Sequence, residues 1–189
     1  MSTAVQHAPL ISAGDYLAGE ITSLSKHEYL NGVVYAMAGG TMRHSAIAVR
    51  LMAILYPRLR GGRCQPYNSD LLLRVQMKED LRFYYPDATI HCGEMNADAR
   101  IIDDPTVIFE VLSESTARTD TGEKRMAYLT IPTLEAYVLV DSERREVTVW
   151  RQRSGQWGPE VLTAPDATLE FASASCSLSV GEIYEGTGL

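Results

Sequence analysis

The stretch Val107-Ile108-Phe109-Glu110-Val111-Leu112 carries one carboxylate inside an otherwise apolar run. Side chains alternate between the two faces of a strand, so Glu110 shares one face with Ile108 and Leu112, and the other face is wholly apolar. A strand that is apolar on both faces lies inside a sheet that is covered on both sides. The stretch therefore predicts a central strand of an α/β domain.

A second apolar run, Ala88-Thr89-Ile90-His91-Cys92, begins directly after Tyr85-Pro86-Asp87. Proline favours extended backbone in the residue before it, which suits the start of a strand. If this strand lies beside the Glu110 strand, Asp87 and Glu110 meet at one end of the sheet. Two neighbouring carboxylates raise one another's pKa unless a cation keeps both ionised, and Mg²⁺ prefers oxygen ligands. We therefore predict that Asp87 and Glu110 bind Mg²⁺, with Mn²⁺ as an alternative.

Residues 119–129 have the composition of a helix that follows the Glu110 strand. Asp120 and Glu123 have the spacing of a capping pair, which would place Lys124 in the first turn of the helix. Asp120 is either a helix cap, which we favour, or a ligand at the site. Lys124 then points toward the end of the Glu110 strand, or lies on the surface as an ordinary helix charge. Two carboxylates and an ammonium suit phosphodiester hydrolysis, which needs metal ligands and a cation that orients the attacking water.

The order Pro86-Asp87, Glu110 and then a lysine resembles the PD-(D/E)XK restriction-endonuclease-like superfamily. The chain is most similar to its large branch of bacterial restriction-endonuclease-like proteins, and the likeness covers nearly all residues. It is carried by Lys26-His27-Glu28-Tyr29-Leu30-Asn31-Gly32, Met37-Ala38-Gly39-Gly40-Thr41 with Arg43-His44, Asn68-Ser69-Asp70, Tyr85-Pro86-Asp87, and Glu110-Val111-Leu112-Ser113 with Ser115-Thr116. The resemblance implies a mixed β-sheet flanked by helices and a metal-dependent DNA endonuclease. In it, Asp87 and Glu110 hold the metal and a lysine assists the water.

The chain departs from the superfamily pattern at one position. The pattern has its lysine two residues after the glutamate, where this chain has Leu112. Lys124 would supply the ammonium from the following helix, a migration that some members of the superfamily show. The departure leaves a second hypothesis open, a catalytically inactive module that binds nucleic acid or assembles with partners. A glycosidase with Asp87 and Glu110 as its carboxylate pair is a third, but it gives Lys124 no role.

Three further polar residues are accessory candidates, each with a structural alternative. Glu28 is either another acidic group near the metal or a solvated strand end. His44 follows the apolar spacing of its helix and is either a hydrogen-bonded core histidine or part of the site. Asp70 is either a turn residue, which we favour, or an acid that supports the site from outside.

The spacing of apolar runs and of the turn-forming residues between them predicts a single domain over residues 1–189. A short helix (12–20) and a hairpin around Asn31-Gly32 form an N-terminal part at about 12–38. A nuclease-like core at about 41–141 holds a helix (41–56) that Pro57 ends or kinks and strands at 70–75, 84–92, 107–112 and 136–140. A β extension at about 146–185 follows. The predicted class is α/β with additional β-hairpins at both ends.

Charge and symmetry set the expectations for partners. The formal net charge of −7 opposes tight binding to nucleic acid, so we expect modest, salt-sensitive DNA binding. Arg43 and Arg50 share a helix face near Arg58, Arg60 and Arg63, which is either a phosphate-binding surface or an ordinary solvated face. We expect a homodimer, because two symmetric sites can cut both strands of a duplex.

The cysteines and the N-terminal sequence indicate the compartment. Cys64, Cys92 and Cys176 are widely spaced and form no Cys-x-x-Cys pair, which predicts reduced thiols rather than a disulfide or a zinc site. The chain has no apolar run of about 20 residues and its start lacks the layout of a secretory signal. These features predict a cytoplasmic protein that does not enter a membrane.

Overall fold

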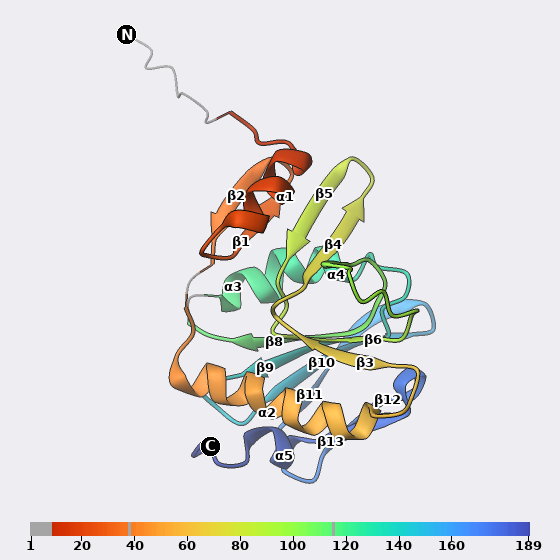
Figure 1. Ribbon diagram of the computed structural model, residues 1–189. Helices are drawn as coiled ribbons and strands as arrows, with labels where there is room; N and C mark the ends of the chain where they lie inside the picture. Colours follow the sequence, from red (N-terminus) through yellow and green to blue (C-terminus); the bar gives the residue numbers. More distant parts are fainter. Residues whose placement is uncertain (1–8, 38, 115) are drawn as a thin grey trace.

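The computed structural model describes residues 9–37, 39–114 and 116–189 (Figure 1). The elements in chain order are α1 (Ala13–Thr22), β1 (His27–Leu30), β2 (Val33–Ala36), α2 (Met42–Leu59), β3 (Gln65–Asn68), β4 (Leu72–Met77), β5 (Asp80–Tyr84), β6 (Ala88–His91), β7 (Ile101–Ile102), β8 (Pro105–Leu112), α3 (Ala117–Thr119), a π-helical turn (Asp120–Lys124), α4 (Arg125–Tyr128), β9 (Ala136–Asp141), β10 (Val147–Arg153), β11 (Gln156–Leu162), β12 (Thr168–Phe171), a 3₁₀ turn (Ala172–Ala174), β13 (Cys176–Ser179) and α5 (Val180–Tyr184).

The central sheet has the strand order β11-β10-β9-β8-β6-β3, and β8 lies inside it as predicted. β8 runs parallel to β9 and antiparallel to β6. Val107 and Phe109 pack into the core under α2, whereas Ile108 packs on the opposite face with Tyr128 of α4. The α/β class with a mixed sheet between helices is therefore confirmed, and its most buried strand is the one that carries Glu110.

A second sheet, β2-β1-β5-β4-β7, extends from one end of the central sheet and carries α1 (Figure 1). Tyr16 of α1 stacks on Tyr29 of β1 with ring centroids 5.0 Å apart. The predicted hairpin turn is present, since Asn31 and Gly32 both have positive φ, at 45° and 100°. This hairpin brings residues near position 28 toward the central sheet.

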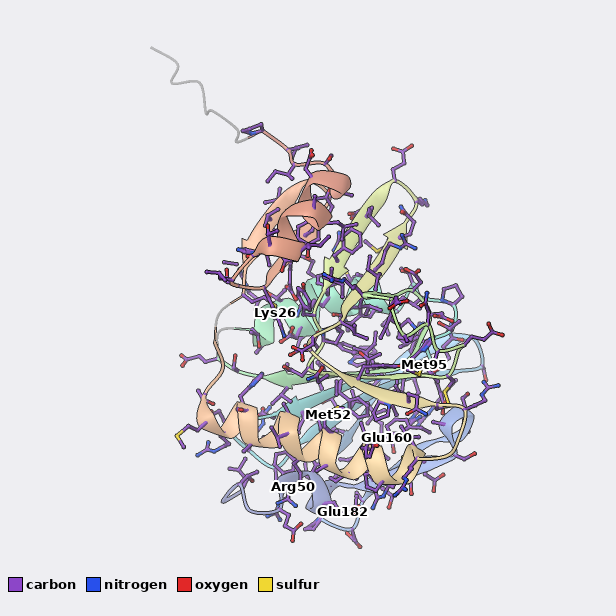
Figure 2. All side chains as sticks on the ribbon, viewed as in Figure 1. Lys26, Arg50, Met52, Met95, Glu160 and Glu182 are labelled. Atoms are coloured by element: carbon purple, nitrogen blue, oxygen red, sulfur yellow. A yellow bond between two sulfur atoms is a disulfide. The ribbon has the colours of Figure 1, made fainter. Side chains whose placement is uncertain are left out.

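The C-terminal hairpin β12–β13 and helix α5 pack beside α2 (Figure 1). Ion pairs tie α2 to this region: Arg50 contacts Glu185 at 2.8 Å, and Arg58 contacts Glu182 of α5. Figure 2 shows Arg50 and Glu182 on this face of the molecule. Arg43 also has an acidic partner, Glu143 at 2.9 Å. For these three arginines of α2, the contacts favour an ordinary ion-paired surface over a phosphate-binding one.

Two predicted element boundaries are wrong. The expected strand 84–92 is broken at Tyr85-Pro86-Asp87, and β5 and β6 belong to different sheets. Helix α2 continues through Pro57 to Leu59, because the proline lies in the last turn and the Leu59 side chain is buried in the core. The prediction missed β3, β7, the individual strands β12 and β13, and helix α5.

The prediction of reduced thiols is also wrong for two of the cysteines. Cys64 and Cys92 form a disulfide, and Cys176 is a buried free thiol. The cause is the register of β3 on β6, which pairs Gln65 with His91 and so places the flanking cysteines opposite one another. The cysteines thus lend no support to a cytoplasmic location. Within the described residues, no helix is long and apolar enough to cross a membrane.

Candidate active site

Asp87 and Glu110 converge on one cavity. The antiparallel register of β6 on β8 pairs Ala88 with Phe109, and its continuation by one residue sets Asp87 opposite Glu110. The Val111 backbone N–H donates to Asp87 Oδ2 at 2.7 Å, which fixes the aspartate against β8. Both carboxylates line a cavity of about 330 Å³. The predicted adjacency of the two strands is thus present.

Lys124 enters the same cavity from the π-helical turn. Its Nζ lies 2.8 Å from Glu28 Oε1, 3.2 Å from Glu110 Oε1 and 3.3 Å from Asp120 Oδ1. The residue is 5% exposed, so the alternative of a surface helix charge is wrong. π-Helical turns are rare and often occur at functional sites.

The expected helix cap at Asp120 is wrong. Helical structure begins at Ala117, so Asp120 lies one turn inside it and four residues before Lys124. Asp120 is 1% exposed and lines the cavity. Its carboxylate therefore belongs to the charge cluster and does not cap a helix.

Glu28 reaches the cluster from β1 of the N-terminal sheet. Its side chain is 13% exposed and is paired with Lys124, so the alternative of a solvated strand end is wrong. The contact joins strand β1 of the N-terminal sheet to the π-helical turn that carries Lys124.

His44 lies at the cavity, near the start of α2. Its Nε2 is 3.3 Å from Asp87 Oδ2, and this contact raises the pKa of His44 above its ordinary value, against the opposing effect of burial. A Cβ on Gly40 would come within 2.6 Å of His44 Nδ1, so the glycine leaves room for the imidazole ring. His44 therefore lines the cavity in contact with Asp87, and its role at the site stays a prediction.

Asp70 is the turn residue that we favoured. It accepts hydrogen bonds from Asn68 at 2.9 Å and from Lys26 at 2.9 Å. The cavity wall next to this turn is formed by Lys26 and Ser69, and Asp70 does not line it. Figure 2 shows Lys26 between the N-terminal sheet and the central sheet.

The cluster contains more negative than positive charge. Three carboxylates, those of Glu28, Glu110 and Asp120, contact the ammonium of Lys124, and the Asp87 carboxylate lines the same cavity. Burial and the neighbouring carboxylates raise the pKa of Glu110 well above its ordinary value, and Lys124 offsets only part of this effect. Burial likewise raises the pKa of Asp120.

The same charges keep the lysine protonated. Burial disfavours a charged lysine, but the carboxylates around it raise the pKa of Lys124 well above its ordinary value. Lys124 is therefore a fixed positive charge. The remaining negative charge favours either protonation of a carboxylate or binding of a cation.

The donor set fits a hard divalent cation with water ligands. Among the described residues, no three His, Cys, Asp or Glu side chains form a group that could hold a metal by themselves. Asp87 and Glu110 offer carboxylate oxygens only, and Mg²⁺ is commonly held by one or two carboxylates while it keeps several waters. The pair therefore fits Mg²⁺ or Mn²⁺ better than a structural zinc ion.

Two residues on the helix that carries Lys124 were not assigned to the site from the sequence: Asp120 was interpreted as a cap, and Tyr128 was missed. Asp120, Lys124 and Tyr128 are four residues apart and point toward Glu110, to which the Tyr128 hydroxyl donates at 2.9 Å. Residues four apart share a helix face, so this spacing is the signal that could have found them once Lys124 was chosen.

Comparison with known proteins identifies a matching family and two similar proteins. The Uma2 family, described as "Putative restriction endonuclease", matches residues 13–180. Uncharacterized protein slr1290 of Synechocystis sp. is 36% identical over 180 residues, 94% of this chain and 93% of that protein. Uncharacterized protein sll1609 of the same organism is 27% identical over 167 residues, 86% of this chain and 93% of that protein.

A solved structure shares the fold. It is described as "a putative nuclease belonging to DUF820 from Anabaena variabilis ATCC 29413", and it superposes with a TM-score of 0.74 over 94% of this chain and 99% of that one, at 19% sequence identity. The predicted resemblance to restriction-endonuclease-like proteins is confirmed. By the extent of the family match, the chain belongs to the Uma2 family.

Proposed function

We propose that the protein is a Mg²⁺-dependent endonuclease that hydrolyses phosphodiester bonds in DNA. The observation that carries the proposal is the meeting of Asp87, Glu110 and the Lys124 ammonium in one cavity. The family description supports a nuclease. Lys124 supplies the ammonium that the superfamily pattern has at the position of Leu112.

Asp87 and Glu110 would hold the metal ion. A bound Mg²⁺ lowers the pKa of its water and stabilises negative charge on a phosphate oxygen. The Val111 N–H and the His44 ring fix the orientation of Asp87. Lys124 stays protonated, so its role is to orient the attacking water or to stabilise charge on the phosphate, and not to remove a proton.

The alternative is a catalytically inactive nucleic-acid-binding or assembly module. One observation favours it: Leu112 stands where the superfamily has its lysine, and Lys124 is held by three carboxylates. Lys26, at 37% side-chain exposure on the cavity wall, is a candidate contact for a DNA phosphate under either hypothesis.

Plasmid cleavage in Mg²⁺ tests the proposal. We expect wild type to nick or linearise supercoiled DNA and EDTA to stop the reaction. Asp87→Ala and Lys124→Ala should each lower the rate by at least about 100-fold, the size of effect seen when one group that stabilises transition-state charge is lost. Glu135→Ala, which changes a carboxylate that lines the other cavity and not this one, is the matched control and should cleave as wild type does.

Two outcomes contradict the proposal. Equal nicking by wild type and all variants would identify a contaminating nuclease. Inactive wild type that still binds DNA at low salt would support the inactive module.

Sedimentation of the protein with and without a duplex tests the homodimer that two-strand cleavage favours.

A further inference from the structure

The two oxygens of Glu110 have different surroundings. Oε1 accepts a hydrogen bond from the Tyr128 hydroxyl at 2.9 Å and another from Lys124 at 3.2 Å. In the part of the chain that the structure describes, Oε2 has no hydrogen-bond donor. Because both donors occupy Oε1, the other oxygen stays available to a ligand in the cavity that Glu110 lines.

The Tyr128 ring is held in one position. It is fully buried and packs edge-to-face against Tyr84 at 5.3 Å and against Tyr137 at 5.2 Å, measured between ring centroids. Protein cores are close-packed, so a ring between two such neighbours has little freedom to turn. Its hydroxyl therefore presents a donor at a fixed point beside Glu110.

We infer that Tyr128 is a positioning residue that sets which oxygen of Glu110 faces the bound cation. The inference rests on the proposed function, because it needs a metal held by Glu110. Hydrogen-bond partners behind a metal-binding carboxylate fix its orientation, and their loss commonly lowers metal affinity by about 10–100-fold. Tyr128 acts through Glu110.

The chain supplies a matched control in the same aromatic group. Tyr137 is also fully buried and packs on Tyr128, but its hydroxyl donates to the main-chain oxygen of Asp120 at 2.9 Å. Tyr128→Phe and Tyr137→Phe therefore remove the same atom from the same core. Only Tyr128→Phe removes a hydrogen-bond donor from a carboxylate of the proposed metal site.

Titration with Mn²⁺, followed by calorimetry and by the electron paramagnetic resonance signal of the free ion, tests the inference. We expect Tyr128→Phe to bind Mn²⁺ about 10–100-fold more weakly than wild type. Tyr137→Phe should stay within about threefold of wild type, and thermal unfolding without metal should show a similar loss of stability in both variants.

The outcomes separate this inference from the proposed function. Wild type that binds no Mn²⁺ at millimolar concentration would overturn the metal site itself. Wild type that binds, with Tyr128→Phe binding equally well, would overturn only the positioning role. Equal weakening in Tyr128→Phe and Tyr137→Phe would overturn it too, since a general loosening of the core would then explain the loss.

A second pair of variants covers a Tyr128→Phe protein that is too unstable to titrate. Tyr128→4-aminophenylalanine keeps a donor at the end of the ring, and Tyr128→4-fluorophenylalanine fills nearly the same space without one. We expect the amino variant to bind Mn²⁺ within about threefold of wild type and the fluoro variant to bind at least about 10-fold more weakly. Equal affinities would overturn the inference.

Discussion

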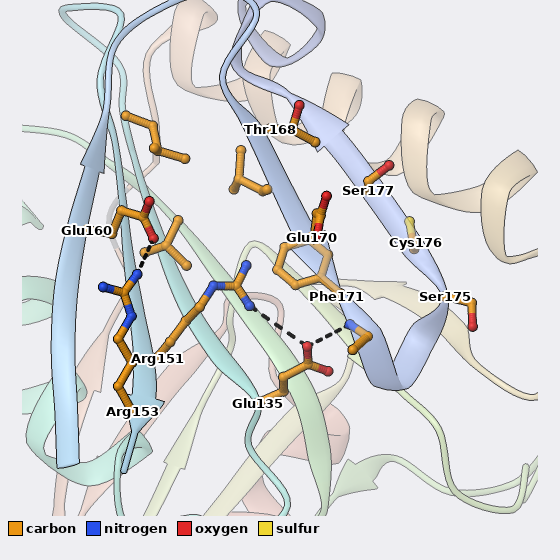
Figure 3. A pocket seen from close by; sticks show the side chains of 14 residues that line it. Glu135, Arg151, Arg153, Glu160, Thr168, Glu170, Phe171, Ser175, Cys176 and Ser177 are labelled. Atoms are coloured by element: carbon orange, nitrogen blue, oxygen red, sulfur yellow. Dashed lines mark hydrogen bonds and ion pairs between the residues drawn. The ribbon is translucent and has the colours of Figure 1, made fainter. Parts of the chain in front are cut away.

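Two cavities of this molecule contain the same kinds of charged residue in opposite arrangements. The cavity between β10, β11 and β12 is the larger, at about 610 Å³ against about 330 Å³ for the cavity of Asp87 and Glu110. In the larger cavity each arginine has a carboxylate (Figure 3): Arg153 contacts Glu160 at 2.8 Å, and Arg151 lies 3.8 Å from Glu135. Each arginine of this cavity therefore has its own carboxylate, and Glu170 is a further carboxylate on the lining.

The smaller cavity is lined by the carboxylates of Asp87, Glu110 and Asp120 and by the ammonium groups of Lys26 and Lys124. Lys26 pairs with Asp70, outside the lining, whereas Lys124 alone faces three carboxylates, those of Glu28, Glu110 and Asp120. Glu110 is 3% exposed and Asp120 is 1% exposed, whereas the Arg151 and Glu135 side chains are each 21% exposed. Burial of a charge without a full partner is costly, and such strain is often kept where function needs it. Unbalanced buried charge thus distinguishes the candidate site where cavity size does not.

The largest expected difference between the two cavities follows from removal of one paired cation from each. Lys124→Met leaves buried carboxylates without a cation, and we expect it to lower the free energy of unfolding by about 3–5 kcal/mol. Arg151→Met removes one of two cations from a solvated cavity and should cost about 1 kcal/mol or less. Urea unfolding at pH 8 without divalent metal measures both.

The two losses of stability should also differ in how they depend on pH and on metal. The loss in Lys124→Met should shrink at pH 5, where a carboxylate can take up a proton instead, and should shrink on addition of Mn²⁺. Equal losses for Lys124→Met and Arg151→Met, at either pH, would show that the buried carboxylates are not strained.

The buried carboxylate of Glu110 predicts how the stability of the protein depends on pH. The pKa of Glu110 is raised in the folded protein, so between its ordinary value of 4.5 and the raised value the folded state holds a proton that the unfolded state has lost. Unfolding stability therefore falls as pH rises through this window, by at most about 1.4 kcal/mol per pH unit for one group.

Glu110→Gln removes this titration. Relative to wild type, we expect the variant to be more stable without metal at neutral pH, to lose that advantage near pH 4.5, and to bind Mn²⁺ weakly. A wild-type slope that Glu110→Gln leaves intact would assign the pH dependence to other groups.

The features that sequence predicted well are local. Asp87 and Glu110 were chosen because strand alternation and one proline reveal a carboxylate in an apolar run. Their adjacency was a hypothesis, and the pairing of β6 with β8 confirms it. The Asn31-Gly32 hairpin has the same local origin. Each of these signals is contained in a few consecutive residues.

The features that sequence missed depend on register between distant segments. The Cys64–Cys92 disulfide follows from pairing of β3 with β6, and β3 was not predicted. Glu28 meets Lys124 only because the N-terminal hairpin joins a separate sheet that reaches the central one. Asp120 has the composition of a cap, and only the earlier start of the helix at Ala117 places it inside the site.

The smallest expected effect lies at the rim of the larger cavity. Arg153 and Glu160 are 69% and 43% exposed, so water and salt screen their 2.8 Å ion pair. We expect Arg153→Gln to change the free energy of unfolding by about 0.5 kcal/mol or less at 50 mM NaCl, and by less still at 500 mM NaCl. Thermal unfolding at both salt concentrations, with Mn²⁺ titration beside it, checks the expectation. A salt-independent loss above about 1 kcal/mol, or weaker Mn²⁺ binding, would mean that the two cavities are energetically coupled. The larger cavity would then contribute to the candidate site although its arginines are paired.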